Sequence, residues 1–209
     1  MSGPSGWTRR DFTGGAALLA LALGIPAAAV RLTDLDAKDA PTDRQRSLIA
    51  LVCDLVIPRT DTPGARDVGV GDFVVLALAH GLGGTRAPMA SGTVTAALGP
   101  YIRRDGSLRH LAWLEGSLDR AAGGDFLRHG RERCTGWLAA LDAEAFAPNA
   151  ENSPWKAIKA LILTGYYTSE AGGSQELRYE LVPGKWAWDI PKTPGMRAFS
   201  SDWTAVDFG

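Results

Sequence analysis

Apolar residues recur at helical spacing along most of the chain between residues 42 and 173. In the first stretch Leu48, Val52 and Leu55 fall on one face, at the three- and four-residue steps of an amphipathic helix. This part of the sequence contains no convincing strand pattern. We therefore expect helices over 42–57, 70–80, a short segment between 91 and 104, 108–122, a stretch that follows residue 125, and a last stretch from 153 to the glycine pair at 172–173.

Polar residues and glycines mark the expected ends of these helices. Thr42 and Gln45 have the spacing of a capping box, and Pro58 stops the helix that they begin. Asp125 is expected to cap the fifth helix. Ser153 followed by proline begins the last one, and Gly172 or Gly173 is expected to end it in a left-handed cap. The predicted fold class is all-α: a small irregular bundle of about five or six helices with a long non-regular C-terminal tail.

The tail, residues 179–209, combines helix-breaking residues with many aromatic ones. Pro183, Pro191 and Pro194 exclude helix and interior strand. Disordered segments have few aromatic residues, whereas this tail carries Trp186, Trp188 and Trp203. It either folds back on its own domain or wraps over another subunit, where tryptophan anchors dominate the binding energy.

The N-terminal segment has the three parts of an export signal. Arg9 and Arg10 are followed by Phe12, by an uncharged run over 15–30, and by a stretch of small residues. That run is shorter than the roughly 20 residues of a membrane-spanning helix, and the paired arginines favour the twin-arginine route to the periplasm. The alternative is a buried N-terminal helix with two incidental arginines. The expected organisation is a signal at 1–30, a linker at 31–41, a helical domain at 42–178 and the tail.

The charge and the reactive side chains of the chain exclude further classes of function. The chain has 22 basic and 23 acidic residues, so no broad electrostatic footprint for nucleic acid or for an anionic membrane is present. Cys53 and Cys134 lie among apolar neighbours, and the sequence leaves open whether they form a disulfide. The three histidines, at 80, 110 and 129, stand at no metal-ligand or nucleophile spacing. We therefore predict no catalytic residue, no metal ligand and no cofactor-binding residue in this chain.

Glu170 and Glu176 are the one carboxylate pair that a turn could bring together. Such a pair could act as a general acid and base, but carboxylates at a helix end also bind free backbone N–H groups of the following loop. The glycines between them match neither GxGxxG nor the Walker spacing. A structural or interface role is the favoured interpretation.

Two segments are similar to the gluconate 2-dehydrogenase subunit 3 family. The first is LVCDLVIPRTDTPGA at 51–65, continued by Gly69, Val70 and Phe73. The second consists of YYTSE at 166–170, QELRY at 175–179 and VPG at 182–184. The similarity spans about residues 42–200.

The resemblance implies a small subunit of a periplasmic, flavin-dependent dehydrogenase complex acting on a sugar, a sugar acid or a glycoside. FAD and the oxidation then belong to a large subunit of glucose-methanol-choline (GMC) type, and a cytochrome c subunit often receives the electrons. The small subunit assists folding of the large one and takes it through the twin-arginine translocase, so the complex is periplasmic or membrane-associated. The partner-binding candidates are Glu170, Gln175, Glu176, Tyr179, Trp186, Trp188 and Trp203.

Two other hypotheses remain open from the sequence. The chain could be a stand-alone periplasmic carbohydrate-binding module whose tail tryptophans stack on sugar rings. It could also be a small periplasmic enzyme that uses Glu170 and Glu176. The accessory-subunit hypothesis is preferred because it explains an export signal on a chain that carries no cofactor motif.

Overall fold

The computed structural model describes residues 40–90, 92–148, 150, 152–179, 189 and 191–200. In these residues the elements are α2 (Asp43–Val56), α3 (Val70–His80), α4 (His110–Ala122), α5 (Arg131–Ala145), α6 (Pro154–Tyr167), a π-helical turn (Ala171–Glu176), β1 (Leu177–Tyr179), β2 (Ala198–Ser200), and 3-10 turns at Leu82–Gly84, Gly99–Tyr101 and Phe126–Arg128. The predicted all-α class is confirmed. Six residues for which the sequence predicts a role lie outside the described part of the chain: Arg9, Arg10, Phe12, Trp186, Trp188 and Trp203.

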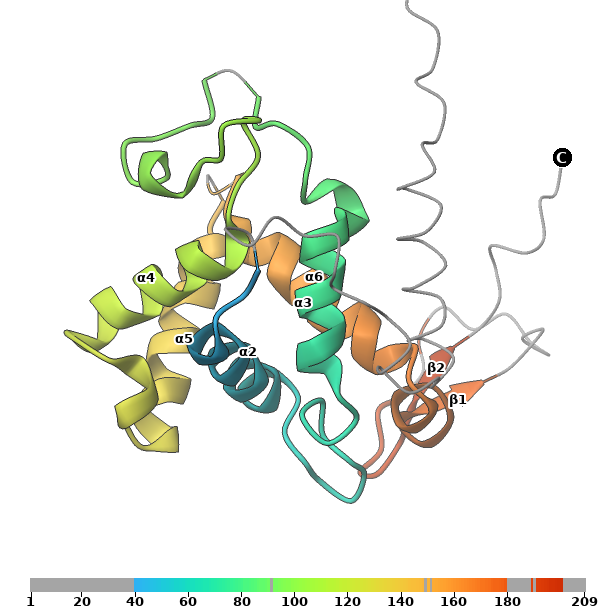
Figure 1. Cartoon of the computed structure of the whole chain (residues 1–209). Helices are drawn as coiled ribbons and strands as arrows, with labels where there is room; N and C mark the ends of the chain where they lie inside the picture. Colours follow the sequence, from blue (N-terminus) through green and yellow to red (C-terminus); the bar gives the residue numbers. More distant parts are fainter. Residues whose placement is uncertain are drawn as a thin grey trace, which may run out of the picture.

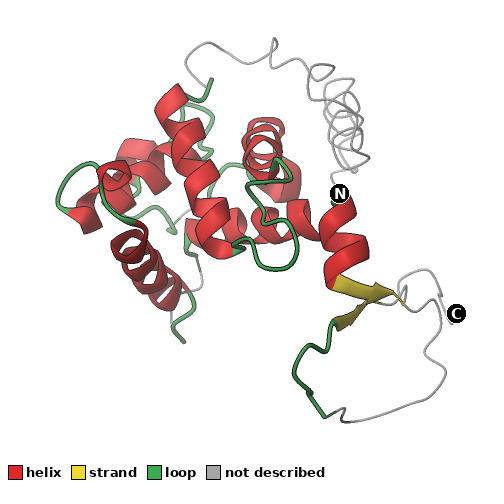
Figure 2. Cartoon of the chain, turned by 90° about the horizontal axis from the view of Figure 1, so that it is seen from below, coloured by secondary structure: helices red, strands yellow, loops and turns green. Residues whose placement is uncertain are grey.

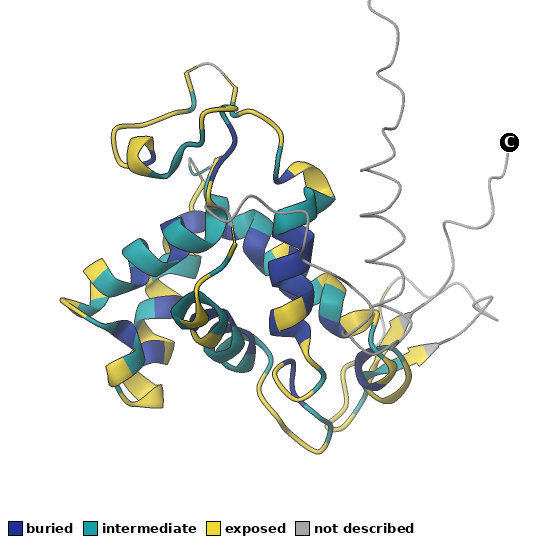
Figure 3. Cartoon of the chain, viewed as in Figure 1, coloured by how far each residue is buried: buried dark blue, intermediate teal, exposed yellow. Residues whose placement is uncertain are grey.

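Helix α2 is the hub of the bundle, because it contacts each of the other four α-helices. Helices α3 and α6 lie side by side, and α4 and α5 pack on the other flank of α2 (Figure 1). In α3 every residue from Val70 to Leu78 except Asp72 is buried, as expected for a helix enclosed by neighbours. Buried positions face inward from all five helices (Figure 3).

Three predicted helix ends are confirmed. Thr42 Oγ1 accepts from the Gln45 amide at 3.1 Å, and Gln45 Oε1 accepts from the Thr42 amide at 3.2 Å, which completes the capping box of α2. Helix α3 spans the predicted residues and ends where Gly81 adopts a left-handed φ of 81°. Proline stands at the first turn of α6, after Ser153.

Two predicted helix starts and one predicted helix were wrong. The segment between 91 and 104 holds only the 3-10 turn Gly99–Tyr101. Helix α4 begins at His110, since Leu108 pairs with Ile102 in an isolated β-bridge. Asp125 does cap a turn, accepting from the Leu127 amide, but that turn is the 3-10 segment Phe126–Arg128, and α5 begins only after Gly130.

The end of the last helix also differs from the prediction. Helix α6 ends at Tyr167, and the chain then winds into the π-helical turn. Neither Gly172 nor Gly173 has a positive φ, so the predicted left-handed cap was wrong. Ser169 supplies the bonds instead: its hydroxyl accepts from the Gly172 amide at 3.1 Å, and its carbonyl accepts from the Gly173 amide at 2.8 Å.

Part of the tail returns to β1 as a second strand, which the sequence did not indicate. Strands β1 and β2 form a parallel two-stranded sheet in which Leu177, Arg178 and Tyr179 stand opposite Ala198, Phe199 and Ser200. The sheet projects beyond the end of α6, away from the other helices (Figure 2). Among the described helices, none has the length and apolar character needed to cross a membrane.

Candidate functional site

The sequence segments at 51–65 and at 166–179 meet in one corner of the molecule. We call it the Glu176 corner, and it consists of Thr62, Pro63, Tyr166 and Glu176. The Thr62 hydroxyl donates to Glu176 Oε1. The Tyr166 hydroxyl donates to the Pro63 carbonyl at 2.9 Å and lies 3.4 Å from Glu176 Oε1. These bonds join the α2–α3 loop to the end of α6 and to the π-helical turn, so residues more than 100 positions apart form one polar cluster.

The α2–α3 loop is shaped by its own residues before it reaches this corner. The Ala65 amide donates to the Ile57 carbonyl at 2.9 Å, and the Gly64 amide donates to Asp67 Oδ2 at 2.8 Å. A Cβ at Gly64 would stand 2.6 Å from the Arg59 backbone nitrogen, so only glycine fits this close approach. The Arg59 guanidinium beside Asp67 is the main cause that holds the pKa of that carboxyl below its ordinary value.

The π-helical turn has an equally specific sequence requirement. A Cβ at Gly172 would collide with the carbonyl oxygen of Tyr166, so the turn closes on α6 only because residue 172 is glycine. Ala171 and Gly172 are buried against the body, while Ser174 and Gln175 face outward. The turn therefore leads the chain from α6 into β1, and its residues Ser174 and Gln175 are exposed to solvent.

The structure brings only part of the predicted partner-binding set together. Glu176 is half-buried and engaged inside the molecule by Thr62 and Tyr166. Glu170 and Gln175 are exposed on either side of the buried part of the turn, and the backbone of Tyr179 ends β1. Within the described residues the hydrogen bonds of Glu176 lead to Thr62 and Tyr166 and not to Glu170, which supports the structural interpretation of this carboxylate.

Neither cysteine is placed for chemistry. Cys53 and Cys134 are both buried free thiols, which answers the question that the sequence left open. Burial raises the pKa of Cys53 to about 12 and also raises the pKa of Cys134. Because the thiolate is the reactive form, both behave as small core residues. In the described part of the chain no cluster of three or more histidine, cysteine or acidic side chains could hold a metal ion.

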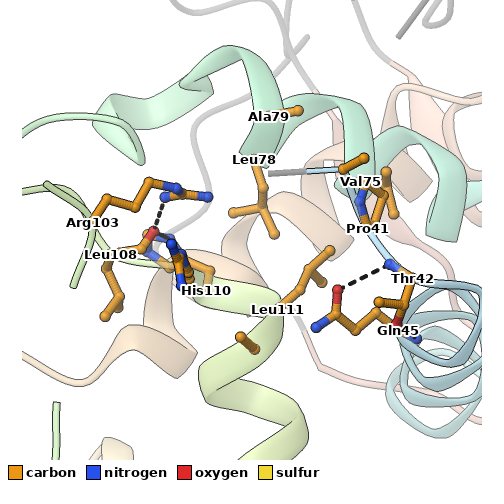
Figure 4. Close-up of a pocket in the computed structure, with 13 residues that line it drawn as sticks. Pro41, Thr42, Gln45, Val75, Leu78, Ala79, Arg103, Leu108, His110 and Leu111 are labelled. Carbon is orange, nitrogen blue, oxygen red and sulfur yellow. Dashed lines mark hydrogen bonds between the residues drawn. The ribbon is translucent and has the colours of Figure 1, made fainter. Parts of the chain in front are cut away.

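A cavity of about 210 Å³ lies between the start of α2, the end of α3 and the start of α4 (Figure 4). Its polar wall is already engaged: Arg103 Nη1 donates to the Leu108 carbonyl at 2.5 Å, and His110 Nδ1 lies 3.1 Å from the same oxygen. Burial is the main cause that lowers the pKa of His110 to about 4, so its imidazole is neutral at ordinary pH. The remaining wall includes Val75, Leu78 and Leu111. This cavity pairs no nucleophile with a base.

Sequence reasoning missed the surface that β1 and β2 make, which we call the tail sheet: residues 177–179 and 198–200. Arg178, Ala198 and Phe199 are exposed, and Phe199 leaves 41% of its surface accessible. The Arg178 guanidinium carbon lies 5.2 Å from the Phe199 ring centroid, in a cation–π contact across the two strands. Three-residue strands are too short to show an alternating pattern, so no sequence signal could have identified them.

Comparison with known proteins gives one match. A family model described as gluconate 2-dehydrogenase subunit 3 matches residues 43–184, which covers the helical body, the Glu176 corner and β1. No curated protein and no solved structure matches the chain.

Proposed function

Because the chain belongs to the gluconate 2-dehydrogenase subunit 3 family, we propose that it is the non-catalytic small subunit of a periplasmic FAD-dependent dehydrogenase that oxidises a sugar, a sugar acid or a glycoside. In this proposal it acts as a folding chaperone and export escort for the large, GMC-type catalytic subunit. FAD resides in that large subunit, and a cytochrome c subunit is a further partner of the complex.

The observation that carries the proposal is the Glu176 corner. The two carboxylates that the sequence suggested as a possible catalytic pair do not bond to each other. Glu176 is hydrogen-bonded to Thr62 and Tyr166, and Glu170 is exposed. The corner fixes the point at which the chain leaves the helical body, and strands β1 and β2 lie beside the end of α6 (Figure 1). That arrangement suits a subunit whose task is to hold another protein.

The order of the segments supports the proposed export role. The twin-arginine pair at Arg9 and Arg10 precedes a body that is capped and closed from residue 42 onward. Since the twin-arginine route carries folded proteins, a catalytic subunit bound to this body crosses with it. Glu170, Gln175, Tyr179, Trp186, Trp188 and Trp203 are the proposed contacts with that subunit.

The test is to replace both arginines of the proposed signal by lysine, Arg9→Lys with Arg10→Lys, and to co-express this chain with the proposed GMC-type catalytic subunit of its complex. We expect the dehydrogenase activity to remain in the cytoplasmic fraction, because lysine keeps the charge but not the paired guanidinium groups. The matched control replaces the two exposed arginines of the α2–α3 loop, Arg59→Lys with Arg66→Lys, and should leave activity in the periplasm. Undiminished periplasmic activity in the signal variant would contradict the escort role.

A further inference from the structure

The tail sheet is incomplete as a sheet. It has two strands of three residues each, and within the described residues no third strand pairs with β1 or β2. Two-stranded pairs of this size have little stability of their own in water, and every sheet edge presents a row of backbone donors and acceptors. Among the described residues, neither outer edge of the tail sheet is paired with a strand.

We propose that the tail sheet is completed by an extended segment of the catalytic subunit, which adds to its edge as a further strand. This inference rests on the proposed function, since it specifies how the small subunit holds its partner. Strand addition takes its affinity from main-chain hydrogen bonds and its specificity from the flanking side chains. The tail sheet offers both in a small, exposed unit.

The charge around the tail sheet indicates the chemistry of the added segment. Among the described residues from 177 to 200, Arg178, Lys192 and Arg197 are basic and exposed, and Asp189 is acidic. A segment rich in aspartate or glutamate complements this excess of positive charge. An apolar residue beside Phe199 completes the match, because the Arg178 guanidinium covers only part of that ring.

The same charges disfavour a second copy of this chain as the occupant. Each of two tail sheets joined edge to edge would carry the same excess of positive charge, with Arg178 and Arg197 in both copies. Like charges on neighbouring strands destabilise a sheet. The catalytic subunit is favoured instead because the family consists of subunits of a dehydrogenase complex.

The attachment of β1 to the helical body is a geometric reason to expect strand addition at the tail sheet. Strand β1 follows the π-helical turn directly, and that turn is fixed by Glu176 to Thr62 and Tyr166. An added strand would therefore be held in a defined orientation to the helical bundle and not on a free tether. Rigid attachment lowers the entropy that binding costs.

Hydrogen exchange of the backbone amides, followed by mass spectrometry, tests the proposal on the full chain alone and in complex with the co-expressed dehydrogenase. We expect exchange in the peptides that contain 177–179 and 198–200 to slow by at least about tenfold in the complex. Peptides from α5, on the opposite flank of the bundle, serve as the internal control and should not change.

A charge reversal supplies the second measurement. Arg178→Glu with Arg197→Glu should raise the dissociation constant of the complex about tenfold or more, and the loss should shrink at high salt. The matched control is Arg133→Glu, at an exposed arginine of α5. A second matched pair compares Phe199→Ala with Phe146→Ala, since both rings are exposed; only the first should weaken binding.

The outcomes separate the two proposals. A complex that forms with neither protection of these strands nor sensitivity to the reversed charges overturns strand addition and leaves the accessory function standing. Protection already present in the isolated chain overturns it too, and dependence of that protection on protein concentration would identify a second copy as the occupant. Failure of the unaltered chain to bind the dehydrogenase overturns the accessory function itself.

Discussion

Arg44 shows how one residue ties the bundle together. Its guanidinium reaches the carboxylates of Glu115, Asp119 and Asp125, with bonds of 2.8 Å to Asp119 and 2.7 Å to Asp125. This contact joins α2 to α4 and to the turn after it, and it is the main cause of the lowered pKa of Asp125. The sequence could not predict it, because the four residues are spread over some 80 positions.

Replacement of this arginine, Arg44→Ala, should lower the free energy of unfolding by about 2 kcal/mol, because three neighbouring carboxylates would then lose the guanidinium that they share, while Asp125 would keep Arg128 as a partner at 3.3 Å. Urea unfolding of the purified chain measures this loss of stability. Arg59→Ala is the control, since the Arg59–Asp67 pair is exposed and should not shift the unfolding midpoint. Equal effects of the two variants would contradict the role given to Arg44.

His110 should make stability depend on pH. Burial is the main cause of its pKa of about 4 in the folded protein, against an ordinary value of 6.5, and the positive charge of Arg103 lowers it further. Between these two pH values the unfolded chain binds a proton that the folded chain does not bind. The stabilisation is therefore complete above pH 6.5 and is lost as the pH falls toward 4.

Across this window we expect the free energy of unfolding to fall by on the order of 2 kcal/mol. His110→Asn keeps a donor for the Leu108 carbonyl but cannot titrate, so it should flatten the profile between pH 6.5 and 4. Unfolding measured at pH 7, 5.5 and 4.5 for both proteins gives the comparison. Parallel profiles would show that His110 does not carry the dependence.

At the scale of elements, the sequence predicted a helix correctly where the residues that begin or end the helix lie next to it in the chain. The prediction for α3 matched because Gly81 ends a nearly continuous apolar run, and α2 matched because Thr42 and Gln45 cap it. Asp125 misled because the same cap begins a 3-10 turn as readily as an α-helix. The tail sheet was missed because its pairing joins strands that are distant in sequence.

The candidate site was predictable only in part, for a related reason. Glu176 was selected as a candidate partner-binding residue, whereas its hydrogen-bonding partner in the structure, Thr62, lies 114 positions away. The π-helical turn depends on Tyr166, whose hydroxyl is held by Pro63 from another part of the chain. Contacts of this kind arise from packing, and no window of the sequence contains them.

The π-helical turn gives the prediction at this scale. Gly172→Ala should destabilise the chain by about 2 kcal/mol or more, because the added methyl group collides with the Tyr166 carbonyl and the turn must open. Gly136→Ala is the matched control. It lies inside α5 with open space around it, and there alanine should stabilise by about 0.5–1 kcal/mol. Thermal unfolding of both variants measures the difference; if Gly172→Ala is also stabilising, the turn is not closely packed.

At the scale of the whole molecule, a closed helical body carries a projecting sheet (Figure 2). Among the described residues the buried core runs from Leu48 to Ala171, and the described tail residues 189 and 191–200 do not belong to it. Stability and partner binding should therefore be separable properties of this chain. That separation is what the accessory function requires.

Deletion of residues 180–209 should leave the unfolding temperature of the body nearly unchanged and should sharply reduce recovery of the catalytic subunit in co-purification. Buried aromatic anchors contribute on the order of 2 kcal/mol each, and the deleted segment contains Trp186, Trp188 and Trp203 as well as β2. Full recovery with the shortened chain would contradict a binding role for the tail.

The capping box at Thr42 has a consequence for the order of events in the cell. Thr42 Oγ1 accepts from the Gln45 amide, so this N-terminal cap of α2 is supplied from within residues 42–45. Removal of the proposed signal at residues 1–30, early or late, would therefore leave this cap of α2 in place. Removal of the proposed signal and folding of the helical bundle can then occur in either order.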